Sequence, residues 1–311
     1  MQTKISTAIK NLESNGYKIM SPLPTLAIGA KFGKDAANTL NVLYMDCETT
    51  GLSLFADEVI EAGFILAKIN ADTAELIEVL DVYQGFNEPL GASISASAQA
   101  THGLTDSDVK GHKLDLERIV GMVKQCDIAC SHNAAFDRPM LEKAVEELTQ
   151  VRFTCSLAEV DWEFESKKLR YIVMELGYHF NGHRAIDDAW AGLWALNCKD
   201  KNGVRYMKSL IEKLDDNVVD VIAVRSPFSA KNFLYDNGYS FFDGNGKKYW
   251  HKVVTDAEVL DELQFLRDEI YVGESIDSEA QLNWLSRYDR FSKRITKDVA
   301  TRWVISDCGE V

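Results

Sequence analysis

The order of the strand-like and helix-like segments constrains the fold of this chain more than any other feature. Three runs rich in β-branched and aromatic residues come first, and their short connections predict an antiparallel meander. From about residue 113, helical periodicity alternates with short apolar strands. We therefore expect an α/β fold in which a mixed sheet is flanked by helices. The expected strands are 40–45, 59–69, 75–82, 127–130 and 151–155, and the expected helices are 114–123, 139–148, 169–176 and 186–196.

Two smaller parts flank this central domain, which we place at residues 39–200. Residues 1–38 contain an expected helix over 4–15 and a polar connection interrupted by prolines. Residues 201–311 predict a small C-terminal α+β accessory module.

The C-terminal module is expected to hold a strand at 218–224, a hairpin around a glycine-rich turn at 243–246, and an amphipathic helix over 256–271. Its aromatic residues could stack on bases, or they could fill a small core or a dimer contact. These residues are Tyr239, Phe241, Phe242, Tyr249 and Trp250.

The composition is that of a globular protein, with 46% apolar and 26% charged residues. No run approaches the roughly 20 apolar residues that span a bilayer, and the first residues lack the apolar core of a signal peptide. The six cysteines are scattered, without the close spacing of a zinc site or a disulfide framework. We therefore expect a cytoplasmic protein that makes no contact with a membrane.

The first candidate for chemistry is the pair Asp46 and Glu48, at the end of an apolar strand. Alternation along a strand places the two side chains on one face, about 6.5 Å apart. Carboxylates so placed repel each other unless a cation lies between them, and Mg²⁺ prefers oxygen ligands. Two solvated acids at a strand end are the alternative, so the pair alone decides nothing.

Two more acidic positions and a histidine lie near expected helix starts. Asp137 is expected at the beginning of a helix, where the dipole favours a carboxylate and where the residue could also be a simple cap. His183 lies in an expected loop, and Asp188 follows in the first turns of the next helix. A neutral imidazole accepts a proton from water near neutral pH. A packed histidine with a capping aspartate is the alternative interpretation.

Taken together, these segments resemble the DEDDh 3′→5′ exonucleases, which include the proofreading epsilon subunit of bacterial DNA polymerase III. The matching motifs are Asp46-x-Glu48 on a strand, the post-strand segment HNAAFD that ends at Asp137, and the loop His183-x-x-x-x-Asp188. The resemblance implies a ribonuclease-H-like fold for the mixed sheet and its helices.

The resemblance also implies roles for individual residues. The acidic side chains would hold two divalent ions, Mg²⁺ or Mn²⁺, and the five-residue spacing from the histidine selects Asp188 over Asp187. The implied metal ligands are Asp46, Glu48, Asp137 and Asp188, the implied general base is His183, and the implied substrate contacts are Thr49, Leu52, His102 and Asn133.

The implied reaction is a two-metal-ion hydrolysis of nucleic acid with a free 3′ end to nucleoside 5′-monophosphates, with single-stranded DNA as the expected substrate. The net charge of −14 opposes broad phosphate binding and favours gripping of a chain end. An RNA exonuclease of the ribonuclease T or oligoribonuclease type is one alternative, because these motifs do not read the 2′-OH. A non-catalytic nucleic-acid-binding or assembly protein is another. The sequence leaves open whether a polymerase is a partner and whether the chain forms a homodimer.

Overall fold

The computed structural model describes residues 2–244, 247–272, 279–293 and 300–304. The chain divides into two compact units. The first consists of Met1–Leu214 with Phe291–Lys293, and the second consists of Asp215–Arg290 with Arg294–Val311.

The division after Leu214 lies later in the chain than the boundary expected at residue 200. The reason is the helix α9 (Tyr206–Glu212), whose Met207 and Leu210 are buried in the core of the first unit. This helix therefore packs with the central domain, although it lies in the segment assigned to the accessory module.

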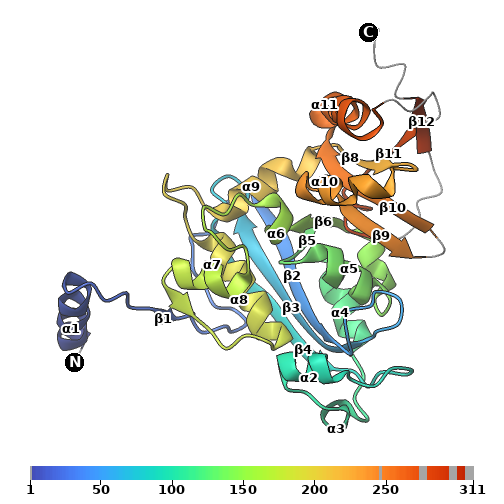
Figure 1. Ribbon diagram of the computed structural model, residues 1–311. Helices are drawn as coiled ribbons and strands as arrows, with labels where there is room; N and C mark the ends of the chain where they lie inside the picture. The colour runs from blue at the N-terminus through green and yellow to red at the C-terminus, as the bar shows by residue number, and fades with distance from the viewer. Residues whose placement is uncertain (1, 245–246, 273–278, 294–299, 305–311) are drawn as a thin grey trace. The chain divides into compact units, whose positions relative to one another are not determined.

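A mixed five-stranded sheet forms the centre of the first unit (Figure 1). Its strands are β2 (Thr39–Thr49), β3 (Val59–Asn70), β4 (Leu76–Phe86), β5 (Ile128–Ser131) and β6 (Arg152–Cys155). Their order across the sheet is β4-β3-β2-β5-β6. The first three strands pair antiparallel, as the expected meander requires, and β2, β5 and β6 pair parallel. The expected ribonuclease-H-like arrangement is confirmed.

Helices cover both faces of this sheet. The helices α7 (Leu169–Glu175) and α8 (Ala185–Asn197) lie over one face, and α4 (Leu116–Val123) and α5 (Ala134–Glu142) lie over the other (Figure 1). The two helical layers enclose two separate hydrophobic cores, one on each side of the sheet.

Alternation along β2 connects the sheet to both cores. Val42 and Tyr44 are buried in the core under α7 and α8, whereas Leu43 and Met45 are buried in the core under α4 and α5. The side chains at even positions of β2 therefore face α8.

The helix α5 begins earlier than the helix expected over 139–148. It starts at Ala134 and ends at Glu142, so Pro139 lies inside it, and a 3₁₀-helix follows at Glu146–Gln150. The missing N–H of Pro139 leaves the carbonyl of Ala135 without its helical partner, but Ala135 is exposed and water can solvate that carbonyl. Asp137 lies in the first turn of α5.

Apart from the 13-residue helix α1, the remaining elements of the first unit are short, and two of them, α2 and α3, lie between β4 and α4. The two-residue strand β1 pairs parallel with β7 and attaches the N-terminal segment to the domain. These elements are α1 (Gln2–Ser14), β1 (Ser21–Pro22), α2 (Ala96–His102), α3 (Asp106–Val109), α6 (Ser156–Glu159) and β7 (Tyr178–His179).

The second unit has its own five-stranded sheet, in the order β12-β11-β8-β10-β9. The expected hairpin is formed by β9 and β10, and its turn includes residues 245–246, which lie outside the described residues. The helix expected over 256–271 forms as three successive segments. A 3₁₀-helix, Lys213–Asp215, spans the division between the two units. The elements of the second unit are β8 (Val218–Ala223), 3₁₀ Phe228–Ala230, α10 (Lys231–Asp236), β9 (Ser240–Gly244), β10 (Lys247–Thr255), 3₁₀ Asp256–Glu258, α11 (Val259–Phe265), a π-helical turn Leu266–Ile270, β11 (Glu279–Leu285) and β12 (Ala300–Val304).

The aromatic residues of the second unit do not form one surface. Tyr239 is buried in the core, and its hydroxyl donates a hydrogen bond to Glu262 (2.8 Å). Phe241 is half-exposed and packs against Trp250, with ring centroids 5.2 Å apart. For Tyr239, the structure therefore favours core packing over base stacking.

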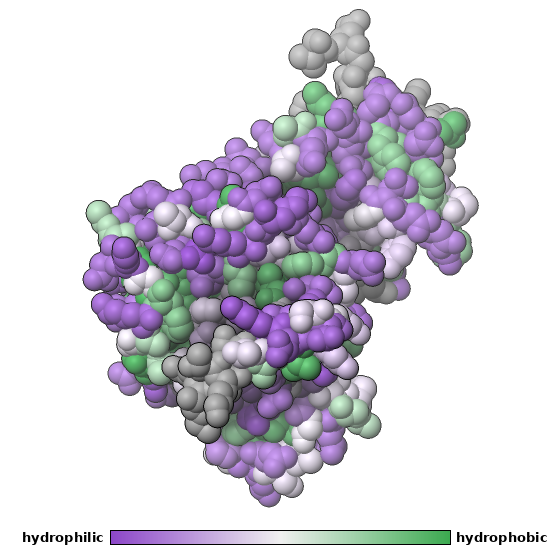
Figure 2. Space-filling view, turned by 90° about the vertical axis from the view of Figure 1, so that its left-hand side faces the viewer, coloured by the Kyte–Doolittle hydropathy of each residue, from purple (hydrophilic) through white to green (hydrophobic). Residues whose placement is uncertain are grey.

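Hydrophilic residues predominate on the face seen in Figure 2, with smaller hydrophobic areas among them. Among the described residues, none of the helices has the length and apolar character needed to cross a membrane.

Close approach of α8 to the sheet depends on two glycines. A Cβ atom at Gly63 of β3 would lie 2.6 Å from the backbone carbon of Ala185, at the start of α8. A Cβ at Gly192 within α8 would lie 2.1 Å from the hydroxyl of Tyr44. The helix therefore rests on β3 and β2 at a distance that only glycine permits at these two positions.

We expect Gly63→Ala to destabilise the protein by about 1–3 kcal/mol, because the added methyl group meets backbone atoms that cannot rotate away. Chemical denaturation followed by circular dichroism measures this change. Gly121→Ala in α4 is the matched control, since a Cβ there meets nothing within 4 Å and should be neutral or stabilising. Equal stability of the two variants would contradict the close seating of α8.

Candidate active site

Three acidic side chains converge where β2 ends beneath α8. Asp46 and Glu48 occupy even positions of β2, on the face that α8 covers, and Asp188 reaches them from the first turns of α8. One carboxylate oxygen from each residue lies within 4.8 Å of the other two. Elsewhere in the described part of the chain, no set of three His, Cys, Asp or Glu side chains meets at this spacing.

Asp188 also holds the turn that precedes α8. Its Oδ2 accepts hydrogen bonds from the backbone N–H groups of His183 (2.6 Å) and Arg184 (3.2 Å). His183 has a φ angle of +71°, a left-handed conformation that residues other than glycine adopt uncommonly. Its imidazole is exposed. The carboxylate of Asp188 thereby fixes the backbone that carries the histidine.

Asp137 approaches from the other face of the sheet. It lies in the first turn of α5 and is buried. Its Oδ1 accepts hydrogen bonds from the N–H (3.2 Å) and the Sγ (3.4 Å) of Cys47, which lies between Asp46 and Glu48. Asp137 therefore borders the group of three carboxylates from the side of α5, although it lies outside the 4.8 Å set.

Two of the expected substrate contacts are engaged in supporting the end of β2. His102 is buried, and its Nε2 donates to the carbonyl of Thr49 (3.3 Å) while its Nδ1 accepts from the N–H of Leu104 (3.1 Å). The hydroxyl of Thr49 donates to the carbonyl of Gly51 (2.6 Å). Both side chains thus have partners within the protein.

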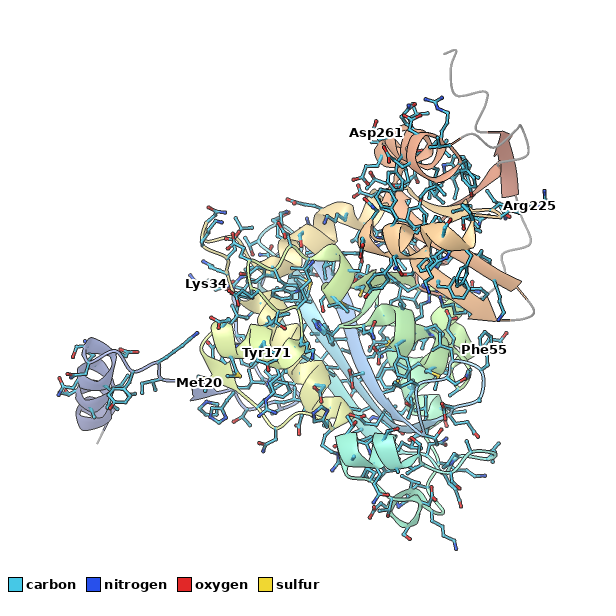
Figure 3. All side chains as sticks on the ribbon, in the orientation of Figure 1. Met20, Lys34, Phe55, Tyr171, Arg225 and Asp261 are labelled. Atoms are coloured by element: carbon cyan, nitrogen blue, oxygen red, sulfur yellow. The ribbon has the colours of Figure 1, made fainter. Side chains whose placement is uncertain are left out.

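The other two expected contacts are accessible. Leu52 is 85% exposed, and Asn133, which precedes α5, is also exposed. Phe55 lies on the same loop as Leu52, is labelled in Figure 3, and is 55% exposed. Asp57 closes this loop, because its carboxylate accepts hydrogen bonds from the hydroxyl of Thr50 and the backbone N–H of Ser53. It presents two apolar side chains directly after the acidic strand.

A family model described as "Exonuclease", of the RNase_T type, matches residues 43–193, the segment that contains all of these positions. Residues 43–193 are an exonuclease domain of this family. The DEDDh resemblance of the motifs is thereby confirmed.

Curated relatives match part of the chain. DNA polymerase III PolC-type of Bacillus subtilis (strain 168) is 29% identical over 191 residues, which cover 54% of this chain and 12% of the relative. The PolC-type enzyme of Thermotoga maritima is 26% identical over 230 residues, which cover 69% of this chain and 15% of the relative. The chain thus spans less than one sixth of the length of either relative.

Solved structures with a similar chain include two nucleases. The nuclease domain of 3′hExo, a DEDDh family member bound to rAMP, is 16% identical, with a TM-score of 0.40 and coverage of 52% of this chain and 92% of that one. Exonuclease I of E. coli in complex with a dA16 oligonucleotide is 13% identical, with a TM-score of 0.46 and coverage of 75% and 71%.

The exonuclease domain gathers partly or fully buried acidic groups at this site, and their pKa values respond to it. Burial raises the pKa of Asp46 well above its ordinary value, and the neighbouring Asp137 and Asp188 raise it further. Burial and then Asp188 raise the pKa of Glu48 to about 8. Burial raises the pKa of Asp137 to about 7, although hydrogen bonds from Cys47 oppose the change. A bound cation would offset both the cost of burying these charged carboxylates and their mutual repulsion, so these oxygens fit a divalent metal ion.

Sequence patterns did not single out two further residues of the exonuclease domain, Glu61 and Arg184. Glu61 lies on β3, directly opposite Glu48 in the register of the two strands. It is fully buried, and Arg184 forms an ion pair with it (2.8 Å). A glutamate within the run of apolar residues that begins β3 was the signal that could have found this pair.

We expect the folded, metal-free protein to lose stability as the pH rises from about 4.5 to about 8. The raised pKa of Glu48 means that the folded state binds a proton more tightly than the unfolded state over this range, so deprotonation favours unfolding. Thermal denaturation in EDTA at several pH values measures the slope. Mn²⁺ should raise the melting temperature more at about pH 8 than at about pH 5.5, because protons and cations compete for the same carboxylates.

Glu48→Gln is the control for this pH dependence. The amide has nearly the same shape but does not titrate, so the variant should show a shallower slope and a smaller response to Mn²⁺. A slope identical to that of the wild type would contradict the assignment of the titration to Glu48.

Proposed function

We propose that the exonuclease domain removes nucleotides from the 3′ end of single-stranded DNA and releases nucleoside 5′-monophosphates. The observation that carries this proposal is the convergence of Asp46, Glu48 and Asp188 within 4.8 Å, next to the turn of His183. Two elements far apart in the sequence supply these carboxylates. The names of the two curated relatives, both DNA polymerases, favour DNA over RNA as the substrate.

The residues that would hold Mg²⁺ or Mn²⁺ are Asp46, Glu48, Asp188 and Asp137. All four offer carboxylate oxygens, the donor type that these ions prefer. Two ions held there would acidify a water molecule and neutralise charge on the scissile phosphate. The protein contributes by fixing the carboxylates on β2, α5 and α8 before the substrate arrives.

His183 is the general base in this proposal. Its exposed imidazole takes a proton from the attacking water and passes it to solvent. The hydrogen bond from its backbone N–H to Asp188 links the position of the base to the position of a metal ligand. A shift of Asp188 would therefore move both groups together.

The experiment that tests the proposal compares DNA and RNA oligonucleotides labelled at either end, with Mg²⁺, Mn²⁺ or EDTA. Stepwise shortening of 5′-labelled DNA and immediate release of the label from 3′-labelled DNA are expected. Preference for RNA would favour an enzyme of the ribonuclease T type, and absence of cleavage would favour a binding or assembly role. A DNA polymerase as partner is part of the proposal and is tested by the same assay with the polymerase added.

Asp188→Ala should lower the cleavage rate by about 10³-fold or more, because a metal site supplies several kcal/mol of transition-state stabilisation. Asp187→Ala is the matched control: it is the same substitution one residue away, on a side chain that lies outside the carboxylate group. It should keep the rate within a few-fold of the wild type.

Asp188→Asn separates the two roles of this residue. The amide oxygen still accepts the N–H groups of His183 and Arg184, so melting temperature should stay near that of the wild type, whereas cleavage should be lost. Cleavage by either Asp188 variant at the wild-type rate would rule out the assignment.

His183→Ala should lower the rate by about 10²–10⁴-fold, the usual contribution of general base catalysis. The stabilisation by Mn²⁺ in a thermal-shift measurement should remain, because the imidazole is not assigned as a ligand. A variant that cleaves at the full rate would show that another group accepts the proton.

A further inference from the structure

The ion pair between the buried Glu61 and the partly exposed Arg184 lies at the edge of the carboxylate group. Glu61 Oε1 accepts from Arg184 Nη2 (2.8 Å) and from the side-chain amide of Gln84 (2.6 Å), and its Oε2 accepts from Arg184 Nε (3.1 Å). Two parallel bonds to a planar guanidinium fix its direction as well as its distance. The guanidinium also lies 5.4 Å from the ring centre of Phe86. The guanidinium of Arg184 thus has two partners, the carboxylate of Glu61 and the ring of Phe86.

The pair acts on the backbone that carries the proposed base. Arg184 lies between His183 and the first residue of α8, Ala185, whose N–H points to Glu61 Oε2 (3.5 Å). Two residues further along β3, Gly63 allows the start of α8 to touch the strand. Residues 183–185 are therefore held by Glu61 from the strand and by Asp188 from the helix.

Helix anchoring alone does not account for a charge at this position. Glu61 lies directly across from Glu48, and like charges opposite each other on neighbouring strands are destabilising. An apolar pair of similar size would seat a helix without adding a carboxylate to an already acidic group. Unlike apolar packing, a bidentate ion pair fixes the orientation of the arginine side chain.

We propose that Glu61 and Arg184 are positioning residues that hold His183 and Asp188 in register with Asp46 and Glu48. The inference rests on the proposed function, since it concerns the metal ligands and the base of that site. Glu61 and Arg184 contact neither the substrate nor the ions in this proposal. They act through the backbone of residues 183–185.

The test uses the full chain with Glu61→Gln, Arg184→Met and the double variant. Two quantities are measured: the Mn²⁺ concentration that gives half of the maximal thermal shift, which requires no turnover, and kcat on labelled single-stranded DNA at saturating Mn²⁺. Each single substitution should raise the half-saturating Mn²⁺ concentration by about 10–100-fold, the usual effect of disturbing residues that orient metal ligands. The double variant should lose no more than either single variant, because the two residues act as a unit.

Arg205→Met is the matched control. Arg205 forms an ion pair with Glu75 and donates to the carbonyl of Asn197, the last residue of α8. It thus secures the same helix at its other end. This variant should lower the melting temperature without changing the half-saturating Mn²⁺ concentration. Arg184→Lys, which keeps the charge but not the two parallel bonds, should recover Mn²⁺ binding only in part.

Wild-type Mn²⁺ binding in the Glu61 and Arg184 variants would overturn the inference, as would losses that multiply in the double variant or an equal loss in Arg205→Met. The Mn²⁺ measurement keeps this result separate from the proposed function. If the wild type cleaves no nucleic acid, the proposed function fails, while the effect of the pair on the metal site is still decided.

Discussion

The seating of α8 on β2 and β3 determines where the acidic side chains of the exonuclease domain lie. Gly63 and Gly192 remove the two Cβ atoms that would hold the helix away from the sheet. The start of α8 then comes to rest on the strand next to the one that carries Asp46 and Glu48. In this position one carboxylate oxygen of Asp188 lies within 4.8 Å of an oxygen of each.

The resulting group is a poor arrangement for stability. Burial and mutual repulsion raise the pKa of Asp46 and Glu48, which means that the folded protein resists placing charge there. A further carboxylate, Glu61, lies across from Glu48 and is compensated by Arg184. Sequences selected for stability alone avoid such groups, and sites that break local rules are usually functional. The arrangement is consistent with chemistry in which cations complete the site.

Local patterns in the sequence predicted the parts of the site that depend on local geometry. Strand alternation placed Asp46 and Glu48 on one face, and the motif spacing selected Asp188 over Asp187. The role of Asp188 in bonding the N–H of His183 is also local, yet it depends on a left-handed turn that no pattern indicated.

What the sequence did not predict depends on contacts between distant residues. The partner of Glu61 is Arg184, more than one hundred positions away, and periodicity says nothing about such a pair. Likewise, α9 lies in the segment that the sequence assigned to the accessory module, but its Met207 and Leu210 are buried in the core of the first unit.

The net charge of −14 bears on how the proposed substrate is held. Repulsion between an acidic protein and a polyanion disfavours attachment along a length of duplex. The loop after the acidic strand instead exposes Leu52 and Phe55, and apolar side chains contact the faces of bases regardless of phosphate charge. A base in a duplex is stacked and paired and offers no free face, whereas an unpaired end does. For the proposed substrate, the acidity of the chain therefore favours a single-stranded end that this loop would contact through its bases.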